Sequence, residues 1–144
     1  MLAKPSLTLK RRLKAAPGRV FAAWTDPEKI ARWFGPKQTL TGSVRAEVDV
    51  RPGGRYRMEF TTDDGERHQV SGVYREVVPD SRLVFTWAWE STPERESLVT
   101  ITIIADGEGS LLTLHHEQFF DQKARDGHER GWTGTLDKLE QFLS

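Results

Sequence analysis

The chain has 144 residues, the size of one domain with a substantial core, and its 21 basic and 21 acidic residues give a formal net charge of zero. This balance argues against a nucleic-acid partner. The sequence contains no cysteine, which excludes disulfides and thiolate metal sites. No stretch near the N-terminus is apolar enough for a signal peptide or a membrane anchor, so we expect a cytoplasmic protein with a single domain over residues 1–144 and no membrane partner.

An amphipathic strand is predicted for residues 6–14, where apolar and polar side chains alternate. Arg11 falls among leucines on the apolar face of this strand. A guanidinium among apolar side chains is unfavourable unless it is paired. We expect Arg11 either to pair with a buried carboxylate such as Glu76 or to bind an acidic group of a ligand.

Two short helices are predicted between this strand and residue 36. Prolines suit the first turn of each helix, and Asp26 is placed to cap the second one. Gly35 followed by proline ends the second helix. Trp33 and Phe34, at the end of its apolar stripe, either belong to the core or line the mouth of a cavity.

Six strands in succession are predicted for the middle of the chain. Short turns rich in glycine, proline and aspartate separate apolar segments, a pattern that is typical of an antiparallel meander. The predicted strands are residues 44–50, 55–61, 69–78, 82–90, 98–105 and 110–117.

Large aromatic side chains gather on one face of these strands. In the segment 82–90, alternation places Phe85, Trp87 and Trp89 on the same side. Met58 and Phe60 share one face of the segment 55–61. The pattern predicts a cavity with aromatic walls, although an ordinary core rich in aromatic residues would give the same pattern.

A long helix is predicted for the C-terminal segment, with an apolar stripe that begins at Trp132. Either Asp121 or Asp126 can cap its N-terminus. Gly127 predicts a break or kink in the early turns. Gly131, directly before Trp132, is expected to let the helix approach the sheet closely.

A series of short motifs runs in order over nearly the whole sequence: segments 11–15, 20–28, 32–36, 49–56, 72–77, 82–87, 112–117, 131–132 and 136–139. Together they resemble the activator of heat-shock protein 90 ATPase homologue (AHSA-like) family, in the START-like SRPBCC superfamily. The resemblance implies an α+β helix-grip fold, in which a curved antiparallel sheet wraps around a long C-terminal helix and leaves a cavity between them. Members include lipid and polyketide binders, cyclases and proteins of unknown role.

The resemblance does not imply a chaperone partner. The eukaryotic co-chaperones of this family carry a second, N-terminal domain that is not part of this sequence. We therefore expect that activation of a chaperone is not the role of the chain.

The histidines are candidates for metal ligands and for catalysts. His115 and His116 are adjacent on a predicted strand, so their side chains point to opposite faces and cannot readily bind one ion. His116 faces inward, and His128 lies one turn before Trp132 on the helix, so both can border the cavity. Neutral histidine can transfer protons, but no nucleophile accompanies them. We predict no metal, no cofactor and no catalytic residue.

The favoured hypothesis is a protein that binds a small apolar, aromatic or lipid-like ligand in this cavity. The alternatives are an enzyme of cyclase or hydrolase type that uses the same cavity, and a stress-response interaction module like a co-chaperone. A homodimer is left open. The predicted ligand-binding residues are Arg11, Trp33, Phe34, Met58, Phe60, Phe85, Trp87, His116, His128 and Trp132.

Overall fold

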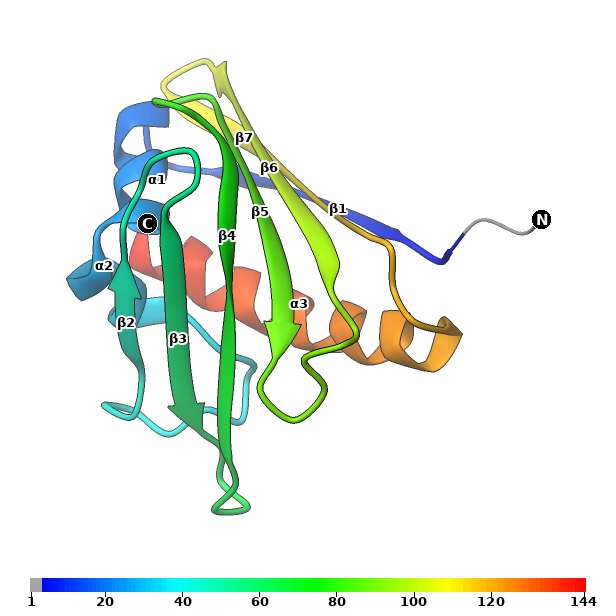
Figure 1. The fold of residues 1–144 in the computed structure, drawn as a ribbon. Helices are drawn as coiled ribbons and strands as arrows, with labels where there is room; N and C mark the ends of the chain where they lie inside the picture. The colour runs from blue at the N-terminus through cyan, green and yellow to red at the C-terminus, as the bar shows by residue number, and fades with distance from the viewer. Residues whose placement is uncertain (1–3) are drawn as a thin grey trace.

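The computed structural model describes residues 4–144, which form one curved seven-stranded sheet and three helices (Figure 1). In chain order the elements are β1 (Leu7–Leu13), α1 (Pro17–Thr25), α2 (Pro27–Trp33), β2 (Arg45–Val48), β3 (Arg55–Thr61), β4 (Arg67–Val78), β5 (Arg82–Trp89), β6 (Ser97–Asp106), β7 (Gly109–Glu117) and α3 (Gln122–Phe142).

The sheet is antiparallel, and its spatial order is β1-β7-β6-β5-β4-β3-β2. The two short helices connect its edge strands β1 and β2, and they lie at one end of α3 (Figure 1). This arrangement confirms the predicted α+β helix-grip architecture. Within residues 4–144, no helix combines the length and the apolar character that a bilayer crossing requires.

Helix α3 crosses the sheet and supplies one side of the core (Figure 1). Asp121 caps it, because its Oδ1 accepts a hydrogen bond from the backbone N–H of Ala124 at 2.8 Å. The helix continues through Gly127 without interruption, so the break predicted there is wrong. The apolar stripe from Trp132 to Leu143 is buried, as its spacing predicts.

The loop after helix α2 is held in place by local contacts, and it packs Phe34 against the core. Asp26 caps the helix through a 3.0 Å hydrogen bond from the N–H of Glu28. Gly35 adopts a φ of +98°, and a Cβ there would collide with the side chain of Thr39. Lys138 of α3 donates hydrogen bonds to the carbonyls of Phe34 (3.2 Å) and Pro36 (3.3 Å), which ties this loop to the long helix.

Arg11 joins β1 to the C-terminal half of α3. Its Nη1 lies 2.6 Å from Oδ1 of Asp137 and 3.5 Å from Oε2 of Glu140. Glu76, the partner suggested by the sequence, pairs with Arg82 instead. Because both carboxylates are on an exposed surface, we expect each bridge to contribute about 0.2–1 kcal/mol.

Candidate functional site

Two hollows adjoin one another between the sheet and the helices. The inner one is small, with a volume of about 10 Å³, and the outer one is an open groove of about 1110 Å³. Phe34, Trp87 and Trp132 line both hollows and form the wall between them. These three rings come from the α2 loop, β5 and α3, and their centroids lie 5.1–6.4 Å apart.

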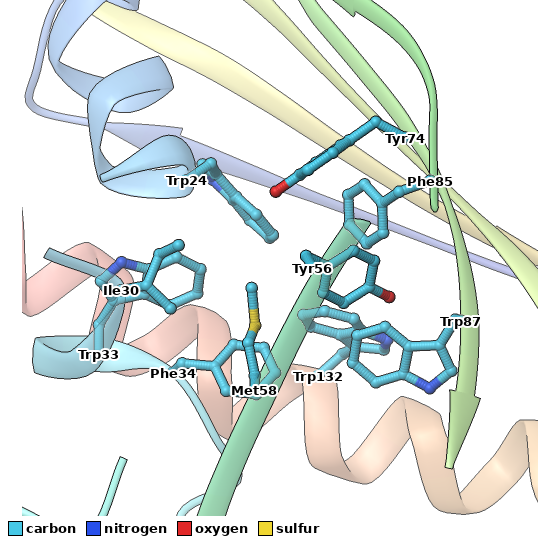
Figure 2. Close-up of a pocket in the computed structure, with 10 residues that line it drawn as sticks. All are labelled: Trp24, Ile30, Trp33, Phe34, Tyr56, Met58, Tyr74, Phe85, Trp87 and Trp132. Atoms are coloured by element: carbon cyan, nitrogen blue, oxygen red, sulfur yellow. The ribbon is translucent and has the colours of Figure 1, made fainter. Parts of the chain in front are cut away.

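Aromatic side chains fill most of the inner hollow (Figure 2). Trp24 and Trp33 meet edge to face at 4.7 Å between centroids, and Trp33 donates a 3.0 Å hydrogen bond to the carbonyl of Ala23. The remaining volume is about that of one water molecule. The sequence predicts a ligand-sized cavity walled by Met58, Phe60, Phe85, Trp87 and Trp132. For Met58 and Phe85 this is wrong, because they border the small inner hollow and pack into the core, whereas Phe60, Trp87 and Trp132 line the open groove.

The open groove provides the ligand-sized space. On its sheet side Phe60 stacks on His68 at 5.1 Å, and it meets Trp89 edge to face at 6.1 Å. On its helix side lie the N-terminal turns of α3, including His128. The β3–β4 turn and the α2 loop provide the remaining walls.

Three glycines of α3 line the groove, and we call Gly127, Gly131 and Gly134 the glycine floor. A Cβ built on Gly131 would meet nothing within 4 Å, so the expected close approach of the sheet at Gly131 is wrong. Gly134 lies so close to the loop after α2 that a side chain would not fit, since a Cβ there would lie 2.9 Å from the backbone nitrogen of Lys37. Glycine within a helix costs about 1 kcal/mol relative to alanine, and packing explains this cost only at Gly134.

His116 is fully buried in a chain of hydrogen bonds behind the groove. Trp132 Nε1 donates to its Nδ1 at 3.0 Å, so the imidazole proton resides on Nε2, which lies 2.7 Å from Ser97 Oγ. The Ser97 hydroxyl in turn donates to the carbonyl of Trp87. Burial lowers the pKa of His116 well below its ordinary value, and the neighbouring His128 and His115 lower it further.

His128 lines the groove, and both of its ring nitrogens are engaged. Trp89 Nε1 donates to its Nε2 at 2.9 Å, and its Nδ1 donates to the carbonyl of Ala124 at 2.7 Å. Burial lowers the pKa of His128, against the opposing effect of the bond to Ala124. Both inward histidines are therefore neutral hydrogen-bonding groups near pH 7 and offer no free nitrogen to a substrate.

These lowered pKa values give a testable pH dependence of stability. As the pH falls from about 7 to about 5.5, the unfolded chain binds more protons at these two histidines than the folded protein does, so the free energy of unfolding should decrease. Urea unfolding at several pH values measures this. His128→Gln should make the decrease smaller, because only His116 of the two histidines then contributes. A constant stability over this range would contradict the assignment.

The predicted site residues thus separate into three groups. Those that line the groove are Phe34, Phe60, Trp87, His128 and Trp132. Trp33, Met58 and Phe85 border the inner hollow, and Arg11 and His116 line neither hollow. Sequence reasoning did not assign Trp89 or the glycine floor to the site, although three glycines within one helix were a visible signal.

A group of possible metal ligands stands at the β3–β4 turn beside the groove. Asp64, Glu66 and His68 bring one ligand atom each to within 4.8 Å of the others. The hydroxyl of Thr62 links two members of this group, because it donates to Asp64 at 2.6 Å and lies 3.1 Å from Nε2 of His68. Hydrogen bonds within the turn therefore account for the arrangement.

Comparison with known proteins agrees with this architecture. The family model described as Activator of Hsp90 ATPase homolog 1-like protein matches residues 14–144. Among solved structures, protein CV1439 from Chromobacterium violaceum is 29% identical, with a TM-score of 0.82 and coverage of 96% of both chains. The AHSA1 protein from Silicibacter pomeroyi is 28% identical, with a TM-score of 0.80 and coverage of 96% of this chain and 97% of that one. CalU16 from Micromonospora echinospora is 30% identical, with a TM-score of 0.69 and coverage of 96% and 76%. No curated protein matches the chain.

Proposed function

The chain belongs to the Activator of Hsp90 ATPase homolog 1-like family, and on this premise we propose that it is a binding protein for small apolar or aromatic molecules. The observation that carries the proposal is the open groove of about 1110 Å³, with aromatic side chains on its sheet side and glycine backbone on its helix side. Its size suits a small organic ligand, and its rings offer stacking surfaces with polar groups at the rim.

Binding is favoured over catalysis by the state of His128. The other histidine that lines the groove, His68, has its Nε2 3.1 Å from the hydroxyl of Thr62 and its ring stacked on Phe60. A cyclase or hydrolase would need a general acid or base within reach of the ligand. His128 is the histidine of α3 that lines the groove, and it uses one ring nitrogen to hold Trp89 and the other to bond Ala124. It therefore shapes the groove rather than transferring protons.

A role like that of the family's co-chaperones would require a continuous apolar docking surface. The large apolar side chains that are exposed within residues 4–144 belong to four separate segments: the α2–β2 loop, the end of β4, strand β6 and the β7–α3 connection. They are Leu40, Val78, Ile104 and Phe120. This distribution favours ligand binding over protein docking, and a cytoplasmic location stays a prediction from the sequence.

The test is titration with N-phenylnaphthylamine, an uncharged probe whose fluorescence rises in apolar surroundings. We expect a Kd on the order of 1–100 μM, since ligands of this size gain about 0.3–0.5 kcal/mol per non-hydrogen atom. Energy transfer from the tryptophans that line the groove should accompany binding. The proposal is wrong if the folded protein leaves the fluorescence of the probe unchanged.

A further inference from the structure

The charged side chains of the groove are balanced in number. Four are acidic and four are basic: Asp63, Asp64, Asp121 and Asp137, and Lys37, Arg95, Lys123 and Arg130. Asp64 and Asp121 accept hydrogen bonds from neutral donors, the hydroxyl of Thr62 and the backbone N–H of Ala124, which position these carboxylates but leave their charge. Among the four acids, Asp137 is the one with an ion-pair partner within residues 4–144, Arg11.

Most of the basic side chains have no such partner. Arg95 lies 3.9 Å from Glu94 and stacks on the ring of Phe120. Lys37, Lys123 and Arg130 make no ion pair with any residue from 4 to 144. In the described part of the chain, the groove charges without an ion-pair partner are thus three cations and three carboxylates, Asp63 and Asp64 in the β3–β4 turn and Asp121 at the N-cap of α3. Within α3 itself, the unpaired charges that line the groove are those of Lys123 and Arg130.

Two of these cations share one face of α3 with the glycine floor. Lys123 stands four residues before Gly127, and Arg130 stands three residues after it, so all three lie along one side of the helix. The guanidinium of Arg130 approaches Gly127, with its Nη2 3.9 Å from the position of a Cβ there. The face therefore combines bare backbone, on which an apolar body can lie, with positive charge beside it.

We propose that the groove binds an organic acid with an apolar body, an aromatic or acyl carboxylate, whose body lies on the glycine floor and whose acid group faces Lys123 and Arg130. This assignment rests on the proposed function and names its ligand class. The carboxylate gains charge-assisted hydrogen bonds from the two α3 cations.

The test compares two ligands of the same shape. Naphthaleneacetate and naphthaleneacetamide differ in one charge, and each is used to displace bound N-phenylnaphthylamine. We expect the acid to bind about 3- to 10-fold more tightly than the amide at low salt, which is the range for two exposed charge pairs. The preference should shrink as the salt concentration rises.

The Lys123→Gln/Arg130→Gln double variant then removes the two positive charges of α3 that face the groove. It should bring the ratio of acid affinity to amide affinity close to one. The control variant Lys10→Gln/Lys14→Gln lowers the net charge by the same amount, at exposed positions in β1 and just after it that do not line the groove. This control should keep the preference for the acid. Equal affinity of wild type for acid and amide would overturn the acid assignment and leave the proposed function standing. If the uncharged probe does not bind at all, both fail.

Discussion

Replacing Gly131 by leucine should abolish binding of the uncharged probe while leaving the protein at least as stable as wild type. A side chain at this position enters open space, because a Cβ there has no neighbour within 4 Å. It would project over the glycine floor and occupy the middle of the groove. Leucine also forms helices better than glycine, by about 0.5–1 kcal/mol. We expect the Kd to rise by at least about 30-fold, the equivalent of about 2 kcal/mol.

Titration and thermal unfolding of the same variant separate these two effects. Gly134→Leu is the matched control, since a Cβ at Gly134 would lie 2.9 Å from the backbone nitrogen of Lys37 and 3.2 Å from its Cβ. That variant should lose about 1–3 kcal/mol of stability through overpacking. Normal probe binding by Gly131→Leu would show that ligands do not use this groove.

His116→Leu should be the most destabilising of the histidine changes. Leucine keeps most of the buried volume but accepts and donates no hydrogen bond. The indole N–H of Trp132 would then lose its acceptor in a buried place, and Ser97 would lose one of its two hydrogen bonds while keeping the one to the carbonyl of Trp87. One unsatisfied buried donor costs about 1–3 kcal/mol and one lost hydrogen bond about 0.5–1.5 kcal/mol, so we expect a loss of about 1.5–4 kcal/mol.

Urea unfolding near neutral pH measures this loss, and His115→Leu is its control. His115 is adjacent on β7 but points to the other face, where it meets the hydroxyl of Thr8 at 2.9 Å on an exposed surface. Its replacement should change the free energy of unfolding by no more than about 0.5–1 kcal/mol. Similar losses in both variants would mean that the network around His116 contributes little.

Local patterns predict most of the fold. The alternation in the strands, the aspartate and proline at the start of α2 and the leucine stripe of α3 are encoded within a few residues of one another, and the structure follows them. Asp121 rather than Asp126 caps α3, a choice that the sequence left open. The resemblance to the AHSA-like family added the topology, which short-range patterns alone do not determine.

The position of the ligand-sized space could not be predicted, because it depends on how rings from distant segments pack. Alternation correctly turns Met58 and Phe85 inward, but whether they border a void depends on Trp24, Trp33 and Tyr74, which fill the same hollow. Similarly, Arg11 finds its partner on α3, 126 residues away. The alternation that predicts its face carries no information on such a contact.

The two halves of α3 differ in what holds them to the sheet. The C-terminal turns are held by buried leucines, whereas the turns up to Trp132 are held by hydrogen bonds: Trp89 to His128, Trp132 to His116, and Arg125 to the carbonyl of Ser6. We therefore expect amide hydrogen exchange to be faster in these first turns than in the leucine-packed turns. A ligand that binds the folded groove should slow this exchange by mass action, so that exchange in the first turns reports binding.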